Sequence, residues 1–350
     1  MTSPAPACPR PPVALSIAGT DPSGGAGIHA DLKAFTARAV YGTTVITALV
    51  AQNTHGVSRV YPIDTDFVAD QFDSVLDDMP VDASKTGMLG SRELVELAVD
   101  RAARTRKDGR SHLGFLTVDP VMVATSGHRL LERDAVSAVR DLLTPVAQLI
   151  TPNIPEAALL LGDDVPEAAD VSQQRAQAVE LVRRGSRAVL LKGGHMLGDR
   201  LVDVLAVAAA TGTATGTSAA TAPWSGEWTR DGDVVLREFH HRRIATPHTH
   251  GTGCTLSAAI TAETAAAVQA GRDMSSPDAI ADAVATALAY LARAIRSGSG
   301  WRLAYDPEGA HGPVDHVVDL TIDGRGQHDA RQHDGRQDDR RQLDGRQGDA

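Results

Sequence analysis

Residues 13–27 read VALSIAGTDPSGGAG, an apolar run that passes directly into a glycine-rich loop. The run Val13–Ala18 has the length and composition of a short buried strand. The loop lacks the Gly-Lys-Ser/Thr ending of a Walker A motif, and its glycines are not spaced as in a dinucleotide-binding fingerprint. A strand, a glycine-rich loop and a helix are typical of a ligand-binding corner in an open α/β sheet. We therefore expect Asp21 to hold a polar organic substrate, with capping of the turn as the alternative role.

A second glycine run, Gly251-Thr252-Gly253-Cys254, precedes a segment rich in Ala, Leu and Ile that predicts a helix over Thr255–Ala270. The first N–H groups of a helix have no internal partner and lie at the positive end of its dipole, so they favour a phosphate. Glycines let the backbone approach such a ligand closely. The run predicts an anion site, and the alternative is an ordinary turn before a helix.

Short apolar runs alternate with amphipathic segments along the rest of the chain. They predict strands over 43–47, 83–86, 114–118, 148–150 and 188–191, and helices over 66–77 and 92–104. Polar residues follow three of the strands at their carboxyl ends, namely Asp119, Asn153 and Lys192. This pattern is typical of a mostly parallel sheet whose site lies along one edge, where several loops meet.

Composition narrows the class of protein. A chain of 350 residues that is 42% hydrophobic can bury a large core in one catalytic domain. A formal net charge of −10 without a basic cluster argues against nucleic-acid and anionic-membrane partners. Two cysteines, Cys8 and Cys254, cannot form a disulfide framework, which favours a reducing cytoplasm. No run of residues has the length of a membrane span or the apolar core of a signal peptide.

Three regions look peripheral to a domain over residues 13–320. A proline-rich leader over 1–12 and a repetitive polar tail over 321–350 are expected to be disordered, since neither can build a core. A run of Ala, Gly, Thr and Ser from Ala206 to Trp228 predicts a loop or flap insertion over 206–230.

Seven motifs in order connect these segments to a known family. They are SIAGTDPSGGAGIHAD (16–31), VITALVAQNT (45–54), KTGML (85–89), DPVM (119–122), TPNIPE (151–156), KGGH (192–195) and THGTGCTLS (249–257). With them the chain resembles the hydroxymethylpyrimidine/phosphomethylpyrimidine kinases of thiamin biosynthesis, in the ribokinase-like superfamily, over about residues 13–318. The departures are His29, where the family commonly has Gln, the long 206–228 run and the tail.

The resemblance implies a ribokinase-like three-layer α/β sandwich, with a mostly parallel central sheet and helices on both faces. It also implies ATP and Mg²⁺ as cofactors, a homodimer, and phosphorylation of 4-amino-5-hydroxymethyl-2-methylpyrimidine and then of its monophosphate. The nearest alternative is a pyridoxal or hydroxymethylpyridine kinase of the same fold. More distant alternatives are a pyrimidine-binding regulator without catalysis and a cysteine hydrolase that uses Cys254 with His248 or His250.

The expected substrate residues are Gly19, Asp21, Gln52, Met88 and Val121. The Gln52 amide offers an acceptor and two donors, which suits the edge of an aminopyrimidine, and in the resembled family this position recognises the pyrimidine. Met88 would pack on the flat ring as an adaptable apolar wall. Without the resemblance, Gln52 would be interpreted as a surface amide and Met88 as part of the core.

The expected nucleotide residues are Lys192, Asn153 and Asp119, and the expected metal residues are Glu156 and Asn153. Asn153 and Glu156 lie three apart at a predicted helix start, so both can face one point, and Mg²⁺ prefers oxygen ligands and retained waters. Lys192 would offset phosphate charge as a mobile point charge.

Cys254 stands where most of the superfamily has an aspartate that takes the proton of the substrate hydroxyl. A thiol at a helix N-terminus has a lowered pKa, so we expect a thiolate to be feasible as the base. Phosphoryl transfer depends mainly on positioning and charge neutralisation, and a general base adds about 10²–10⁴-fold. We therefore expect the amides of Gly251, Thr252 and Gly253 to contribute more than the thiol.

Overall fold

The computed structural model describes residues 10–122, 133–196, 198–209 and 226–320. By its contacts the chain divides into one unit over Met1–Val318 and a second over Asp319–Ala350, and the fold is that of the first. The end of the expected leader belongs to this fold, because Arg10 Nη1 lies 2.6 Å from Asp82 Oδ2. None of the helices in the described ranges is both long and apolar enough to cross a membrane.

Nine strands of the described chain form one sheet in the order β10-β11-β9-β8-β7-β6-β5-β1-β2, and two more, β3 and β4, form a separate hairpin. The strands are β1 Val13–Ala18, β2 Tyr41–Ile46, β3 Ala48–Asn53, β4 Gly56–Pro62, β5 Ala83–Thr86, β6 Phe115–Val118, β7 Leu149–Ile150, β8 Ala188–Leu191, β9 Arg200–Ala208, β10 Thr229–Asp231 and β11 Val234–Arg242. From β2 to β8 the pairs are parallel, whereas β8, β9, β11 and β10 pair antiparallel.

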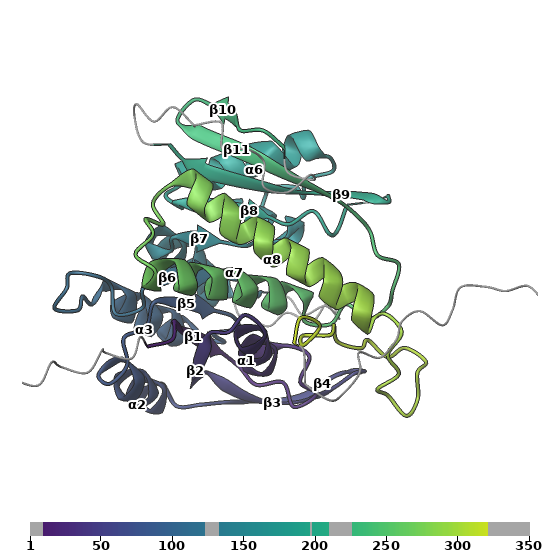
Figure 1. The fold of residues 1–350 in the computed structure, drawn as a ribbon, viewed down its shortest axis with the longest axis horizontal. Helices are drawn as coiled ribbons and strands as arrows, with labels where there is room; N and C mark the ends of the chain where they lie inside the picture. Colours follow the sequence, from purple (N-terminus) through teal and green to yellow (C-terminus); the bar gives the residue numbers. More distant parts are fainter. Residues whose placement is uncertain (1–9, 123–132, 197, 210–225, 321–350) are drawn as a thin grey trace, which may run out of the picture. The chain divides into compact units, whose positions relative to one another are not determined.

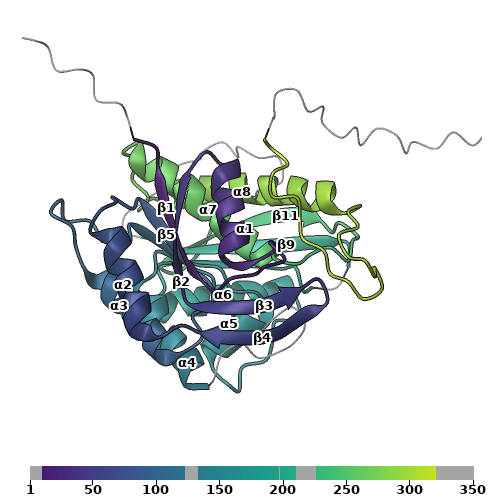
Figure 2. The same ribbon diagram turned by 90° about the horizontal axis from the view of Figure 1, so that it is seen from below.

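Helices cover both faces of the large sheet (Figures 1 and 2). They are α1 Gly27–Ala37, α2 Thr65–Leu76, α3 Arg92–Ala103, α4 Arg133–Ala138, α5 Ile154–Leu161, α6 Val171–Arg183, α7 Thr252–Gln269 and α8 Pro277–Gly298. Helices α1, α7 and α8 pack against one core cluster, and α2 to α6 pack against the other. The expected three-layer α/β sandwich is confirmed.

The alternation of side chains along β1 shows how the two cores arise. Val13, Leu15 and Ile17 enter the core beneath α2 to α6, and Ala14 enters the core beneath α1, α7 and α8. Successive side chains of a strand point to opposite faces, so a strand covered on both sides is apolar throughout. The parallel strands β1, β5 and β6 also end next to one another, since Ile17 pairs with Thr86 and Thr86 pairs with Val118.

A buried ion pair ties α1 to the centre of the sheet. Lys85 Nζ on β5 lies 2.9 Å from Asp31 Oδ1 on α1, and both side chains are fully buried. Ser16 Oγ on β1 donates a 2.5 Å hydrogen bond to Asp31 Oδ2. Removing one partner of such a pair leaves an uncompensated buried charge, at a cost of about 3–5 kcal/mol. The pair therefore fixes the helix that follows the glycine-rich loop.

The predicted loop over 206–230 is wrong at both ends. Its first three residues are the last of β9, and Ala206 is fully buried in the sheet. Trp228 packs against the core, and its Nε1 donates a 2.8 Å hydrogen bond to Asp278 on α8. Residues 210–225 lie outside the described residues, as do 1–9 and 321–350 of the expected leader and tail.

Candidate active site

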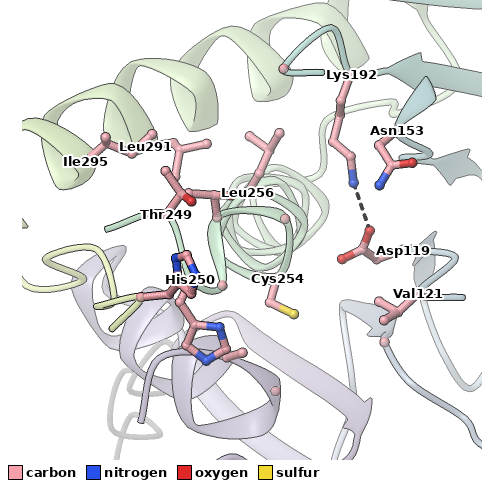
Figure 3. A pocket seen from close by; sticks show the side chains of 18 of the residues that line it. Asp119, Val121, Asn153, Lys192, Thr249, His250, Cys254, Leu256, Leu291 and Ile295 are labelled. Atoms are coloured by element: carbon pink, nitrogen blue, oxygen red, sulfur yellow. Dashed lines mark hydrogen bonds and ion pairs between the residues drawn. The ribbon is translucent and has the colours of Figure 1, made fainter. Parts of the chain in front are cut away.

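A cavity of about 1550 Å³ lies at the carboxyl ends of the parallel strands (Figure 3). Every site residue expected from the sequence lines it: Gly19, Asp21, Gln52, Met88, Asp119, Val121, Asn153, Glu156, Lys192, Gly251, Thr252, Gly253 and Cys254. These residues come from seven separate segments of the chain. The parallel strand order brings them together, because consecutive strands end at the same edge.

The N-terminus of α7 opens into this cavity. Gly251 is the N-cap, with φ 75° and ψ 10°, and no side chain caps the helix. A Cβ at this position would lie 1.7 Å from the carbonyl oxygen of Gly25, so the two glycine loops touch and only glycine fits. No side chain occupies the N–H groups of the first turn, as an anion site requires, although the Thr252 amide donates to the Thr249 carbonyl at 3.2 Å.

The anion site faces a lysine and a carboxylate. A Cβ on Gly253 would lie 3.6 Å from Lys192 Nζ and 3.8 Å from Asp119 Oδ2. Lys192 Nζ donates to Asp119 Oδ1 at 3.1 Å, and Ser257 Oγ on α7 donates to Oδ2 at 3.2 Å. The glycine at 253 therefore leaves the space between the helix start and this ion pair open.

Both members of the ion pair are charged. Burial raises the pKa of Asp119, but the nearby Lys192 and Lys85 outweigh it and hold that pKa below its ordinary value. Burial lowers the pKa of Lys192, but Asp119 and Glu156 outweigh it, so that pKa is raised. The end of β8 thus carries a positive charge beside the anion site.

Asn153 and Glu156 form a capping box at the start of α5. Asn153 Oδ1 accepts from the Glu156 amide, and Glu156 Oε2 accepts from the Asn153 amide, both at 2.8 Å. The amide end of Asn153 that faces Lys192 is its nitrogen (Figure 3), which cannot coordinate a cation. The geometry therefore argues against Asn153 as a metal ligand and favours contact of its NH₂ group with phosphate.

Glu156 retains the chemistry of a cation ligand. Its side chain is buried, and burial raises the pKa to about 7, against the opposing effect of Lys192. Lys192 Nζ lies 3.9 Å from Oε2. A carboxylate with so little solvation gains strongly from a nearby cation.

The expectation of a lowered thiol pKa at Cys254 is wrong. Burial raises this pKa to about 11, and the positive charge of Lys85 offsets only part of the rise. The carboxylates Asp31 and Asp119 raise it further. The effect of burial on the pKa of this half-buried thiol therefore outweighs its proximity to a helix N-terminus, and the thiol is neutral at neutral pH.

The carboxylate of Asp21 organises its own loop. Oδ1 accepts from Ser23 N at 2.9 Å and Ser23 Oγ at 2.6 Å, and Oδ2 accepts from Ala26 N at 2.8 Å. His250 Nε2 lies 2.7 Å from Oδ2. Burial would raise the pKa of Asp21, but the hydrogen bonds from His250 and Ser23 lower it to about 2. Because the side chain is only 2% exposed, the alternative role of capping the turn describes it better than direct contact with a substrate.

Close packing shapes the loop after β1. A Cβ on Gly27, whose φ is 55°, would lie 2.3 Å from the carbonyl oxygen of Gly19. A Cβ on Gly19 would lie 2.8 Å from Met88 Cε, so glycine at 19 makes room for the methionine. His29, the departure from the family pattern, accepts a 3.1 Å hydrogen bond from the Asp21 amide through Nδ1. His29 therefore still makes a hydrogen bond to this loop, although the family commonly has Gln at its position.

Gln52 reaches the cavity from a bulge in β3. The pairing of β3 with β4 shifts register between Ala51 and Gln52. A bulge redirects side chains, which is why bulges occur beside active sites. The Gln52 amide nitrogen lies 3.1 Å from His250 Nε2. From the sequence, His250 is expected only as a possible partner of Cys254 in a hydrolase, whereas the structure places it in contact with Gln52.

None of the residues expected from the sequence lies at the end of the cavity next to α8, which we call the far end. Its apolar lining consists of Leu288, Leu291 and Ile295 on α8 and Ile244 after β11, and Arg293 and Arg296 of α8 also line the cavity. Figure 3 shows Leu291 and Ile295 on the opposite side of Cys254 from Asp119 and Val121. The 3.6-residue spacing of these side chains on a long helix is the signal that could have found them.

Comparisons with known proteins agree with this geometry. The model of the phosphomethylpyrimidine kinase family matches residues 21–227 and 227–315. The hydroxymethylpyrimidine/phosphomethylpyrimidine kinase of Salmonella typhimurium is 45% identical over 249 residues, which are 71% of this chain and 81% of that protein.

Solved structures give the same fold. Bacillus subtilis pyridoxal kinase in an ADP complex has a TM-score of 0.68 at 32% identity, over 88% of this chain and 98% of that one. The phosphomethylpyrimidine kinase of Clostridium difficile 630 has a TM-score of 0.59 at 32% identity, over 81% of this chain and 99% of that one. The chain therefore belongs to the phosphomethylpyrimidine kinase family and is a phosphotransferase of ribokinase-like fold.

Proposed function

We propose that the protein transfers the terminal phosphoryl group of ATP to the hydroxyl of 4-amino-5-hydroxymethyl-2-methylpyrimidine, and then phosphorylates the monophosphate, in thiamin biosynthesis. The observation that carries the proposal is the single cavity that joins Gln52 and Met88 to the N-terminus of α7. A ring held at one end would place its hydroxymethyl group toward the anion site. The enzyme then needs only to fix the in-line geometry and neutralise charge.

The nucleotide would lie with its phosphates at the first turn of α7 and its base toward Leu291 and Ile295. Backbone amides and Lys192 would stabilise the charge that develops on the transferred group. Lys192 must leave Asp119, which it contacts at 3.1 Å, or share its hydrogens with the phosphate. The apolar far end would exclude water from the base.

The donor set fits Mg²⁺ held mostly by nucleotide and water. The described residues contain no group of three or more His, Cys, Asp and Glu side chains placed to hold a metal ion. Mg²⁺ commonly binds through one or two carboxylates plus substrate phosphates, and Glu156 can supply such a contact directly or through water. The ion would supply charge neutralisation at the phosphate oxygens.

We assign Cys254 to shaping the anion site rather than to removing the proton. A neutral thiol with a pKa of about 11 is a weak base at neutral pH. The hydroxyl proton can pass to an oxygen of the transferred phosphoryl group, and from there to water, as the new O–P bond forms, because a loose transition state has little need of early deprotonation.

A coupled ADP assay tests the proposal. ADP release with hydroxymethylpyrimidine and with its monophosphate, in the presence of Mg²⁺ and abolished by a chelator, is the expected result. Pyridoxal is the competing alcohol, because a pyridoxal kinase is among the similar structures. A kcat/KM higher for pyridoxal than for hydroxymethylpyrimidine would reject the proposed substrate in favour of a pyridoxal kinase.

The hairpin β3–β4 supports the expectation of a homodimer. It carries exposed Leu49, Val57, Val60 and Tyr61 on a two-stranded sheet separate from the main one. An isolated hairpin is marginally stable, so a second copy that covers these side chains would stabilise it. Light scattering of the wild type and of Tyr61→Lys tests this, and a monomeric wild type would reject it.

A free Cys254 and the use of ATP fit a cytoplasmic enzyme.

A further inference from the structure

One ring nitrogen at the substrate end of the cavity faces two other side chains. His250 Nε2 lies 2.7 Å from Asp21 Oδ2 and 3.1 Å from the Gln52 amide nitrogen. All three residues line the cavity, and they come from the loop after β1, from β3 and from the loop before α7. The histidine is therefore in direct contact with the residue expected to recognise the ring.

The carboxylate decides where the imidazole carries its hydrogen. Asp21 is ionised, because hydrogen bonds from His250 and Ser23 lower its pKa to about 2 in spite of the burial that raises it. An ionised carboxylate only accepts, so at 2.7 Å His250 Nε2 must be the donor. A ring nitrogen that carries a hydrogen cannot accept from the NH₂ group of Gln52.

Two donors facing each other at 3.1 Å repel. A half turn of the Gln52 amide exchanges its oxygen and nitrogen in place and converts this contact into a shared hydrogen bond from His250 Nε2. The amide oxygen has a second lone pair, and both hydrogens of the nitrogen then point away from the imidazole. Only one of the two amide orientations is therefore compatible with His250.

We propose that His250, held by Asp21, is a positioning residue that sets the polarity of Gln52, with the amide oxygen toward the imidazole and the NH₂ group toward the substrate. This rests on the proposed function. A 4-aminopyrimidine offers a ring nitrogen as acceptor beside an amine as donor, which matches a fixed NH₂ donor and carbonyl acceptor. Its 4-oxo counterpart offers the reverse, an N–H beside a carbonyl oxygen, and would be rejected.

Backbone contacts that do not involve the imidazole also hold the loop in place. The His250 amide donates to the Gly312 carbonyl at 3.2 Å, and Gly251 packs directly against the Gly25 carbonyl. These backbone contacts remain when the ring is replaced. A change in ring selectivity can therefore be separated from a change in folding.

Two variants of similar length test the proposal. His250→Gln keeps an N–H donor near the position of Nε2, with one hydrogen for Asp21 and one for Gln52, whereas His250→Met has no donor. The measurement is kcat/KM for ADP release with hydroxymethylpyrimidine and with its 4-oxo analogue. We expect the amino-to-oxo ratio to fall by about tenfold in His250→Met, the worth of one net hydrogen bond, and to stay near that of the wild type in His250→Gln.

An unchanged ratio in His250→Met, or an equal fall in His250→Gln, overturns the proposal. If His250→Met turns over too slowly, the ratio of the two dissociation constants, measured by calorimetry, gives the same comparison, and the melting temperature reports its folding. A wild type that releases ADP with the amino ring but does not prefer it over the oxo ring refutes this inference alone. A wild type that releases ADP with neither ring refutes the proposed function, and the inference with it.

Discussion

The two ends of the cavity are built from different parts of the chain. The phosphate end consists mostly of backbone, with Gly251 as the N-cap of α7 and Gly253 open toward Lys192. The substrate end consists of side chains, with Gln52, Met88 and His250 brought in by loops and a hairpin. Backbone amides offer the same donors whatever side chains surround them, whereas side chains change with each substitution. A family can therefore keep its phosphoryl chemistry while it changes the ring it accepts, as the likeness to a pyridoxal kinase illustrates.

The strongest way to break the backbone end is to fill it. Gly253→Val places a side chain between the helix start and Lys192, where a Cβ makes only ordinary contacts of 3.6 and 3.8 Å, so the fold should persist. We expect kcat/KM to fall by about 10³-fold or more, because the donors to the phosphoryl group become inaccessible. Steady-state ADP release and the melting temperature are measured together. Gly300→Ala, which meets no atom within 4 Å, is the matched control, and a kcat/KM within tenfold of wild type in Gly253→Val would contradict the anion site.

Removing the positive charge of Lys192 beside the anion site should reduce activity less than Gly253→Val does. Lys192→Met keeps the length of the side chain and loses the cation next to the phosphates, so we expect turnover to fall by about 10²-fold. Asp119 then loses one of the two lysines that hold its pKa down, and nucleotide binding should weaken because its carboxylate lies beside the anion site without its nearest cation. Turnover and calorimetric binding of ATP report the two effects. Lys107→Met, at an exposed position outside the cavity, should change neither.

At the substrate end, the carboxylate of Asp21 should contribute to the free energy of unfolding. The folded pKa of Asp21, about 2, lies below the ordinary 3.8, so its stabilisation is complete above about pH 4 and is lost as the pH falls toward 2. We expect Asp21→Asn to lower the free energy of unfolding by about 2 kcal/mol at pH 7. The difference from wild type should shrink at pH 2–3. Chemical denaturation at both pH values measures it, with Asp70→Asn on the exposed face of α2 as control, and a difference independent of pH would exclude the carboxylate as its source.

Cys254 joins the two ends and should give the smallest effect. We expect Cys254→Ala to lower turnover by less than about tenfold and to leave ATP binding near normal, because the thiol is neutral at neutral pH. Alkylation of the wild-type thiol should rise about tenfold per pH unit up to about pH 11, since only the thiolate reacts. A plateau in alkylation near pH 7, together with a hundredfold or greater loss of turnover in Cys254→Ala, would restore the thiolate base.

Local patterns predicted the fold well for the parallel strands and for the amphipathic helices between them. The expected bounds of β5 and β8 equal those observed, and those of α2 and α3 differ by one residue. The antiparallel part failed, because the Ala-rich end of β9 resembles a loop in composition although it is buried. Alternation of apolar strands and helices implies parallel crossovers, and it carries no signal for a hairpin of strands at the edge.

The sequence predicted which residues line the site better than it predicted their protonation states and contacts. Motifs located the residues that line the cavity, because the carboxyl ends of parallel strands meet at one edge of the sheet and bring the residues that follow them together. The state of Cys254 and the contacts of His250 depend on partners far away in sequence, since His250 meets Asp21 across 229 positions and Gln52 across 198. Burial and such contacts arise only when the chain is folded, so a helix-terminus rule predicted the wrong direction for the thiol pKa.

The loop before α7 is held from both ends of the fold, by Gly25 near its start and by Gly312 and His316 near its finish. The amide of His250 donates to Gly312, and His316 Nε2 lies 3.0 Å from Thr255 Oγ1 on the first turns of the helix. During translation the phosphate loop therefore lacks these two contacts until residues 311–316 have left the ribosome. A nascent chain arrested before that point would expose its glycine loop but would not transfer phosphoryl groups from ATP.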